Sequence, residues 1–485
     1  MTEIKIQIVD YNLFEYEKNF LAKEIKRWGG IVKEGKIERN STLIVKGLSL
    51  EKAKRLTYIK SVFYRSIFYP SLQSIRESFN GKSARTQSRR YGPHGLHEYK
   101  GRFNPQMPRS LMLANFNSTA IVLDPFMGSG TTMVEARDLG YNAIGVELNP
   151  FACLLAKAKK IYEEIPALGE IRWSSNSKSE NFFDSETKDY LLKWFPRKQF
   201  NQLEFIQRHL VQLDSNQRII AQVVMSNLLR DHSLQNPKDL RIRRRDTVPI
   251  DFDLLDTFKT TFKEISIKHA EWIKEFSIKK RKDTQLFNAD SRNLKDIIKI
   301  KVNGSVSSPP YATALPYVDT YRLSMVALGL IHPKEILKRE KELIGSRDVT
   351  IADKTSFGKH VSILPSTVQE VINYIYEEIN KDSEAGFRKK AAPYAFARYC
   401  VSMLRVLEEL YSIEKIGSKN FWVLGPNRIK LRSNWFTMET PELVGELAKK
   451  VGFKKVSIEP VQAYNRYDMH SKNSISKESI LVFQR

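Results

Sequence analysis

The sequence predicts an α/β protein in which helices cover both faces of a mostly parallel β-sheet, with a small N-terminal α+β module and a mostly helical insert. The main observation is the succession of a strand, a glycine-rich turn, a helix and a second strand over residues 119–150, which is the pattern of a βαβ unit. Further strand-like runs follow at 284–290 and 301–311, and others lie near the C-terminus. A hydrophobic content of 41% is enough for packed cores and excludes wholesale disorder.

The first 70 residues alternate strand-like and helix-like runs. Residues 4–11 and 41–47 have the apolar pattern of strands, and residues 13–30 form an amphipathic helical pattern that ends at two glycines. Residues 62–69 are rich in aromatic and β-branched side chains and are expected to form one more strand. This order predicts a small module of the ferredoxin-like type.

The rest of the chain divides by composition. Residues 71–102 contain few apolar and several basic side chains, and we expect a basic linker or arm there. Residues 103–160 contain the βαβ unit and form the first half of the main domain. A mostly helical insert follows over 161–280, and residues 281–485 complete the sheet, with a second helical insertion around 330–410.

Charge is the most informative feature of the composition. The 485 residues include 79 Lys and Arg against 55 Asp and Glu, which gives a net charge of +24 and favours a nucleic-acid partner. No run of apolar residues is long enough for a transmembrane helix, and the N-terminus does not have the pattern of a secretory signal. The two cysteines are too few for a disulfide framework or a cysteine-based zinc site. We therefore expect a cytoplasmic protein.

The glycine-rich turn is the first candidate binding element. It spans residues 124–132 (DPFMGSGTT), and such a turn between a strand and a helix lets the backbone and helix N–H groups approach a ligand. Met133 replaces the third glycine of the dinucleotide fingerprint, and no Gly-Lys-Ser/Thr follows. Glu147 ends the next strand, where a carboxylate can accept hydrogen bonds from ribose hydroxyls. A generic βαβ turn with a capping acid is the alternative.

The second candidate element is Ser308-Pro309-Pro310-Tyr311, which follows the strand-like run that begins at residue 301. The two prolines fix the backbone and lack N–H donors, so the carbonyl of Ser308 is held rigidly and can accept a hydrogen bond. This carbonyl and the Ser308 hydroxyl could both accept from an exocyclic amine, and Tyr311 offers a ring for an extruded base. A plain polyproline turn is the alternative when the motif is taken alone.

Together these segments resemble the S-adenosylmethionine-dependent DNA amino-methyltransferases of the cytosine-N4 and adenine-N6 type. DPFMGSGTT and GVELNP are similar to the family's motifs I and II, KGRFNPQMPRSLM to motif X, FNADSRNL to motif III, and SPPY to the catalytic motif. The resemblance implies a Rossmann-like methyltransferase sheet, S-adenosyl-L-methionine as cofactor, and catalysis by Ser308, Pro309, Pro310 and Tyr311. The cofactor-binding residues that it implies are Phe103, Pro105, Asp124, Pro125, Phe126, Gly128, Gly130, Thr131, Glu147, Asn149 and Asp290.

The sequence context of the two cysteines bears on the class of reaction. Methylation of a base carbon needs a thiolate, usually presented after a proline, whereas Cys153 and Cys400 lie in apolar helical patterns. We therefore expect direct in-line transfer to an exocyclic amine of a flipped base. Within the family, Ser-Pro-Pro-Tyr is associated more often with cytosine N4 than with adenine N6, so cytosine N4 is the preferred target and adenine N6 the alternative.

The expected partners are double-stranded DNA and, as in the usual setting of the family, a cognate restriction endonuclease. Arg241, Arg243, Arg244 and Arg245 are the candidate DNA contacts, with a solvated face or internal ion pairs as the alternative. The insert over 161–280 is a candidate target-recognition region, although it precedes the segment similar to motif III. No metal site is expected, because the histidines at 94 and 97 have no acidic or thiol partners at ligand spacing.

Two other functions remain open at this point. An RNA methyltransferase acting on a base amine, such as a tRNA enzyme, is the first, because some of those enzymes carry an N-terminal RNA-binding module. A non-catalytic nucleic-acid-binding regulator is the second, although intact Asp124, Glu147 and Ser-Pro-Pro-Tyr argue against it. The target sequence and the oligomeric state are not encoded in any of these motifs.

Overall fold

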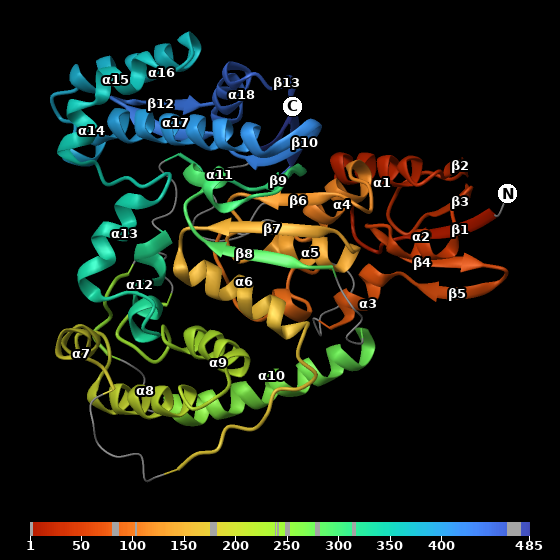
Figure 1. Cartoon of the computed structure of the whole chain (residues 1–485), viewed down its shortest axis with the longest axis horizontal. Coiled ribbons are helices and arrows are strands. Elements are labelled where there is room, and N and C mark those ends of the chain that lie inside the picture. The colour runs from red at the N-terminus through yellow and green to blue at the C-terminus, as the bar shows by residue number, and fades with distance from the viewer. Residues whose placement is uncertain are drawn as a thin grey trace.

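The computed structural model describes residues 3–79, 87–101, 104–174, 182–237, 239, 242–247, 253–276, 282–312, 317–462 and 477–485. An N-terminal sheet lies at one end of the molecule, a larger sheet forms the centre, and two groups of helices lie on opposite sides of the larger sheet (Figure 1). Within the described residues, none of the helices is both long and apolar enough to cross a lipid bilayer.

The N-terminal sheet has five strands in the order β2-β3-β1-β4-β5, and all recorded pairings are antiparallel. Its elements are β1 (Glu3–Ile8), α1 (Glu15–Arg27), β2 (Ile31–Glu34), β3 (Thr42–Lys46), α2 (Leu50–Arg55), β4 (Ile59–Tyr64) and β5 (Ile67–Pro70). The first four strands and two helices follow each other as βαββαβ, with β1 and β3 in the centre. This is the ferredoxin-like arrangement, extended by β5 at one edge.

Two segments differ from the expectations. Residues 62–69 do not form one strand but the end of β4 and most of β5, because Arg65 and Ser66 adopt positive φ angles of 50° and 63° and turn the chain into a hairpin. Residues 71–102, expected as a linker, contain helix α3 (Leu72–Ser78) and the short 3₁₀ turn η1 (Gly92–Gly95). Tyr91 and His94 of this segment are fully buried, so its described part is packed against the main domain.

The central sheet has seven strands in the order β13-β14-β10-β9-β6-β7-β8. The strands are β6 (Ile121–Asp124), β7 (Asn142–Glu147), β8 (Thr284–Asn288), β9 (Val302–Ser307), β10 (Glu414–Leu424), β13 (Lys454–Gln462) and β14 (Lys477–Gln484). Strands β8, β7, β6, β9 and β10 are parallel, and β14 pairs antiparallel with both β10 and β13. The strand order reverses between β6 and β9, and in open α/β sheets ligands bind outside the carboxyl ends of the strands at such a point.

Helices cover both faces of this sheet, as expected for a Rossmann-like fold. Val122 and Leu123 of β6 point to opposite faces and belong to different apolar clusters. The cluster around Val122 includes the N-terminal module, α4 (Gln106–Asn115) and α5 (Thr131–Leu139), and the cluster around Leu123 includes the C-terminal helices. The sheet with its helices on both faces confirms the fold class predicted from the sequence.

Two helical insertions extend the sheet connections. Between β7 and β8 lie α6 (Pro150–Tyr162), α7 (Ser185–Leu192), α8 (Arg197–Leu210), α9 (Ser215–Leu228) and α10 (Leu254–Phe276). Between β8 and β9 lie η2 (Ser291–Asn293) and α11 (Leu294–Ile297). Between β9 and β10 lie α12 (Tyr317–Ala327), η3 (Pro333–Glu335), α13 (Ile336–Glu342), α14 (Ile351–Thr355), α15 (Phe357–Ser362), α16 (Ser366–Asn380) and α17 (Phe387–Ile413). After β10 follow the two-stranded sheet of β11 (Asn427–Leu431) and β12 (Asn434–Met438) and helix α18 (Thr440–Val451).

Candidate functional site

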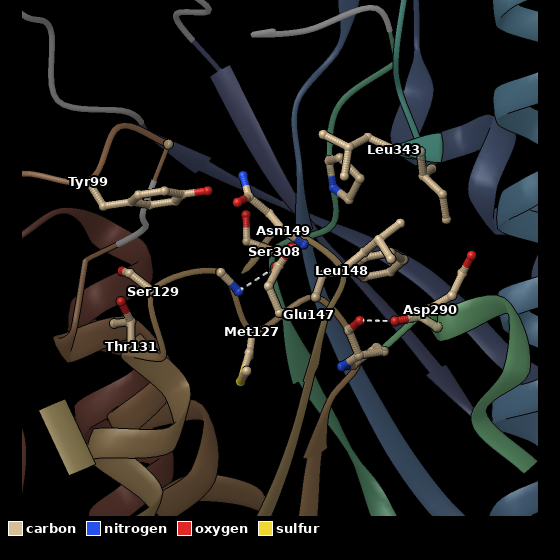
Figure 2. A pocket seen from close by; sticks show the side chains of 17 residues that line it. Tyr99, Met127, Ser129, Thr131, Glu147, Leu148, Asn149, Asp290, Ser308 and Leu343 are labelled. Atoms are coloured by element: carbon tan, nitrogen blue, oxygen red, sulfur yellow. Dashed lines mark hydrogen bonds between the residues drawn. The ribbon is translucent and has the colours of Figure 1, made fainter. Parts of the chain in front are cut away.

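A pocket of about 820 Å³ lies at the carboxyl ends of β6, β7, β8 and β9, where the strand order reverses. Figure 2 shows Tyr99 on one side of this pocket and Leu343 and Asp290 on the other, with Glu147 and Ser308 between them. Nine of the residues singled out in the sequence line it: Pro125, Phe126, Gly128, Thr131, Glu147, Asn149, Asp290, Ser308 and Pro310. Residues from four separate strand ends therefore meet at one site.

The glycine-rich turn after β6 has the backbone conformation that requires glycine. Gly128 and Gly130 have φ angles of 49° and 76°, and a Cβ atom on Gly130 would lie 2.9 Å from the Cβ of Ala156 on α6. Asp124 is buried beneath this turn and does not line the pocket. Its carboxylate accepts hydrogen bonds from the Ser307 hydroxyl (2.6 Å) and the Phe126 N–H (3.1 Å), and burial raises its pKa to about 6. Asp124 thus joins β6 to β9 and fixes the turn.

Glu147 connects the two turns that border the pocket. Its carboxylate accepts hydrogen bonds from the N–H of Gly128 (2.9 Å) and the N–H of Asn149 (2.8 Å). Burial raises the pKa of Glu147 to about 7, and the nearby charge of Asp124 acts in the same direction. Each carboxylate oxygen keeps a further lone pair for a ligand donor.

Asn149 has an unused donor beside the pocket. Its side-chain oxygen caps helix α6 by accepting hydrogen bonds from the N–H groups of Phe151 (2.9 Å) and Ala152 (3.4 Å). Its amide nitrogen is buried and has no hydrogen-bond partner in the described part of the chain. A buried donor without a partner costs about 1–3 kcal/mol, which a bound ligand with an acceptor there would recover.

Asp290 lines the pocket, but its carboxylate is already paired. Arg292 donates to both of its oxygens, at 2.6 Å from Nη2 and 3.0 Å from Nε. The neighbouring Ser291 hydroxyl donates to the carbonyl of Pro125, so the loop after β8 is tied to the turn after β6. Any ligand donor at Asp290 therefore shares the carboxylate with Arg292.

The Ser-Pro-Pro-Tyr segment directly follows β9. Ser308 and Pro310 line the pocket, Pro309 is buried, and Tyr311 lies outside the pocket lining. The Tyr311 hydroxyl donates to a carboxylate oxygen of Glu478 on β14 at 2.7 Å. The following residue, Ala312, accepts a hydrogen bond from Asn427 at the start of β11. The segment is thus held from the sheet on one side and from the β11–β12 hairpin on the other.

Eight lining residues were not identified from the sequence: Tyr99, Gly101, Met127, Ser129, Leu148, Ser291, Leu343 and Ile344. Met127, Ser129, Leu148 and Ser291 are direct neighbours of predicted residues, so their positions could have been found from the motifs alone. Tyr99 lies in the segment expected as a linker, where its ring stacks on that of Tyr321 with centroids 5.1 Å apart. Leu343 and Ile344 come from the helical insertion, and no sequence signal marks them.

Besides Asp124, the predicted cofactor contacts Gly130 and Pro105 are not among the residues that line the pocket. Phe103 is outside the described residues. Pro105 is buried at the start of α4 and does not line the pocket. Gly101 belongs to the segment similar to motif X and lines the pocket, and so does Tyr99, which immediately precedes that segment.

The predicted arginine cluster forms a bridged turn in its described part, with Arg244 paired to Gln235. Arg241 is outside the described residues. Arg243 is exposed and lies 3.9 Å from Asp239, and the Arg245 guanidinium donates to the carbonyl of Ser233 (2.9 Å). Arg243 and Arg244 thus face solvent, whereas Arg245 holds the turn together.

The two histidines of the segment before α4 are buried. His94 lies 2.8 Å from the carboxylate of Glu135 on α5, and burial lowers its pKa to about 3. In the described residues, no group of three or more His, Cys, Asp or Glu side chains is placed to hold a metal ion. The observed role of His94 is a hydrogen bond within the core.

Both cysteines are buried in apolar clusters away from the pocket lining. Burial raises the pKa of Cys153 to about 11 and that of Cys400 well above its ordinary value, so neither thiol is ionised at neutral pH. We expect the double variant Cys153→Ala, Cys400→Ala to keep methyl-transfer activity within about threefold, because buried thiols are not nucleophiles. Initial rates with tritiated S-adenosylmethionine measure this, and a loss of several orders of magnitude would indicate a covalent mechanism.

Comparisons with known proteins relate the chain to DNA methyltransferases. Residues 13–158 match the N6/N4 methyltransferase family model, which is described as DNA methylase. A stretch of 100 residues is 39% identical to the type II methyltransferase M.MjaII of Methanocaldococcus jannaschii and covers 21% of this chain and 19% of that protein. The type II methyltransferases M.BsoBI of Geobacillus stearothermophilus and M.AvaI of Anabaena variabilis are 23% and 19% identical, over 79% and 83% of this chain and 83% and 89% of their own lengths.

A solved structure, that of TrmN from Thermus thermophilus, aligns over 100% of both chains with 10% identity and a TM-score of 0.34. This score is too low to establish a common fold, so the fold assignment rests on the strand order and the strand directions. Residues 13–158 thus match a DNA methylase family model, and the chain is similar over most of its length to type II methyltransferases, a likeness that implies S-adenosylmethionine as the methyl donor.

Proposed function

We propose that the protein is a site-specific modification methyltransferase that methylates the N4 amine of cytosine in duplex DNA and acts beside a cognate restriction endonuclease. The observation that carries this proposal is the position of Ser308 and Pro310, which line the same pocket as Glu147 and Gly128. A group that can accept from a base amine thus lies next to a site suited to the cofactor. The curated type II methyltransferases among the relatives support the restriction-modification setting.

The residues at the pocket fit the cofactor. Glu147 would accept hydrogen bonds from the ribose hydroxyls, because its carboxylate lies at the end of β7 with one lone pair free on each oxygen. Phe126 and Leu148 offer apolar contact for the adenine ring, and Asp290 would accept from the adenine amine. The unpartnered amide of Asn149 offers a donor to an acceptor atom of the cofactor.

The chemistry assigned to this chain is positioning. When bound, S-adenosylmethionine supplies a methyl group on a positively charged sulfur. Ser308 would accept hydrogen bonds from the target amine with its hydroxyl and its carbonyl, which favours a tetrahedral nitrogen whose lone pair is available for attack. Pro309 and Pro310 would keep this carbonyl in place, and Tyr311 would stack on the extruded base. A correctly oriented pair of reactants needs no covalent nucleophile.

Two features bear on the choice of target. A neutral serine accepts hydrogen bonds more weakly than a carboxylate, and in the family this motif is associated with cytosine N4, so adenine N6 is the alternative. The ferredoxin-like order of β1 to β4 supports a second candidate, methylation of an RNA base amine, because small α+β modules of this kind occur in RNA-binding enzymes. The family match and the relatives favour DNA.

One assay distinguishes these targets. The full-length protein is incubated with tritiated S-adenosylmethionine and either plasmid DNA of mixed sequence or total tRNA, and the nucleosides are then separated by chromatography. Label in N4-methylcytosine is the expected result. Label in N6-methyladenine would overturn the preference for cytosine, and label only in RNA would overturn the proposal of a DNA substrate.

The raised pKa of Glu147 gives the cofactor affinity a pH dependence. Hydrogen bonds from ribose hydroxyls favour the ionised carboxylate, and a pKa of about 7 leaves Glu147 mostly protonated at pH 6 and mostly ionised at pH 8. The affinity should therefore rise about tenfold between these values. Isothermal titration calorimetry measures it, and Glu147→Gln should bind more weakly with a flatter profile. An equally steep profile in Glu147→Gln would assign the dependence to another group, such as Asp124 or the cofactor itself.

A further inference from the structure

A second and larger cavity, of about 2,580 Å³, lies beside the Ser-Pro-Pro-Tyr segment. We define the basic groove as this cavity, which is walled by α12 and α13, by residues 345–349, by the first turns of α17 and by the β11–β12 hairpin. In Figure 1, α13 lies between the two groups of helices, and α17 and β12 lie above it. The groove is formed by the insertion between β9 and β10 and by the hairpin that follows β10.

The lining of the basic groove is strongly positive. It has nine basic side chains (Arg322, Lys341, Arg347, Lys354, Arg388, Lys389, Lys390, Arg428 and Lys430) against three acidic ones (Asp319, Glu340 and Asp348). Burial raises the pKa of Glu340 to about 7, so this carboxyl carries only part of a negative charge at neutral pH. Within the described residues no ion pair is recorded for Lys341, Lys390 or Lys430, and all three are exposed. Their charges are available to an anionic partner.

Apolar and aromatic groups stand among these charges. The side chains of Phe387 and Trp435 line the groove and are 81% and 56% exposed, and the guanidinium of Arg428 lies 5.1 Å from the ring centroid of Trp435. Exposed aromatic rings next to basic side chains are suited to contact bases and sugars as well as phosphates. The walls include the two-stranded ribbon of β11 and β12, and the major groove of DNA can admit such a ribbon.

The basic groove is continuous with the catalytic segment. Gly345 lines the groove, and a Cβ atom on it would lie 2.8 Å from the carbonyl oxygen of Tyr311. Its neighbours Leu343 and Ile344 line the cofactor pocket. On the other side, Asn427 of the hairpin donates to the carbonyl of Ala312. A polyanion lying in the groove would thus lie next to the chain at Tyr311 and Ala312.

We propose that the basic groove is the surface that binds the DNA duplex, with the base to be methylated turned from it toward Tyr311. This inference rests on the proposed function and assigns its DNA contacts mainly to the insertion between β9 and β10 and the β11–β12 hairpin, and only at the margin to the insert over 161–280. The arginine turn lies at the margin of the same surface, since Ile242 lines the groove and the adjacent Arg243 is exposed. The positive charge of the N-terminal module is not part of this surface.

The test compares two triple variants of the full-length protein. Lys341→Gln, Lys390→Gln and Lys430→Gln remove three charges from the groove, and Lys33→Gln, Lys36→Gln and Arg39→Gln remove three exposed charges from the N-terminal module. Binding of a fluorescent, mixed-sequence duplex of about 30 base pairs is measured by anisotropy over a range of salt concentrations. Each variant is also checked for its melting temperature and for cofactor affinity by calorimetry.

The groove variant should bind duplex at least about tenfold more weakly at 0.1 M salt, and its slope of log affinity against log salt should fall by about 2 to 3, because each lost phosphate contact removes about 0.9. The N-terminal variant should stay within about twofold of the unmodified protein. Equal losses in both variants, a larger loss in the N-terminal variant, or stronger competition by an RNA duplex than by DNA would overturn the assignment. Failure of the unmodified protein to methylate any DNA would instead overturn the proposed function.

Discussion

Replacing Tyr311 by alanine is expected to lower kcat at least about 100-fold, because a base without its stacking surface is no longer held in line with the methyl group. Tyr311 does not line the cofactor pocket, so the affinity for S-adenosylmethionine should stay within about twofold. Single-turnover methyl transfer and calorimetry measure the two quantities separately. A parallel collapse of cofactor affinity would show that Tyr311 supports the pocket rather than the target base.

The matched control is Tyr311→Phe, which keeps the ring and removes only the hydrogen bond to Glu478. The ring stays packed in this variant, so we expect a decrease in kcat of about tenfold or less, which corresponds to at most about 1.4 kcal/mol in the barrier. Glu478→Gln keeps an acceptor at the same position and should therefore have a smaller effect than Tyr311→Phe. If Tyr311→Phe were as inactive as Tyr311→Ala, the hydroxyl rather than the ring would be the important group.

Replacing Glu135 by glutamine is expected to have the largest effect on stability. The carboxylate of Glu135 is fully buried and lies 3.0 Å from Arg76 on α3 and 3.1 Å from Arg109 on α4. Burial alone would raise the pKa of Glu135, but the charge of Arg76, the hydrogen bond with His94 and the charge of Arg109 together hold it below the ordinary value. Removing one partner from a buried ion pair costs about 3–5 kcal/mol, and here Arg76 and Arg109 would be left to share the carboxylate of Asp138.

Urea unfolding followed by fluorescence measures this loss of unfolding free energy. The control is Glu98→Gln, which removes an exposed carboxylate paired with Arg90, and exposed pairs contribute about 0–1 kcal/mol. Because the folded-state pKa of Glu135 is lowered, its contribution to stability is present above the unfolded-state pKa and is lost as the pH falls. A Glu135→Gln protein as stable as Glu98→Gln would show that Asp138, which also contacts both arginines, is sufficient on its own.

Much of the fold could be predicted because its signals are local. The βαβ unit, the glycine-rich turn and the strand that leads into Ser308 depend on residues that are neighbours in the sequence. The hairpin at Arg65 was missed because neither Arg65 nor Ser66 is a residue type that favours positive φ. The packing of the segment over 71–102 was not predicted because its polar side chains have partners distant in sequence, as in the hydrogen bond from Gln106 to Glu77 and the ion pairs of Arg76 with Glu135 and Asp138.

The pocket residues that the sequence indicated are also those whose signals are local. Glu147, Asn149 and Ser308 lie at strand ends, where chain order alone brings residues to one edge of a parallel sheet. Leu343 and Ile344 reach the pocket only through the path of the insertion, which depends on how α12 and α13 pack. The basic groove is likewise assembled from residues more than 100 positions apart, so the one basic run among them, Arg388-Lys389-Lys390, does not by itself reveal it.

Both insertions take the place of an ordinary crossover between neighbouring parallel strands, one joining β7 to β8 and the other β9 to β10. The sheet therefore fixes where each insertion starts and ends, while nothing in the sheet fixes its length or composition. Such segments can be exchanged or lengthened during evolution without altering the strand ends that carry Glu147 and Ser308. The residues at the strand ends can thus stay the same while the segment between β9 and β10 changes. A change in that segment can alter which DNA sequences are recognised without altering the pocket.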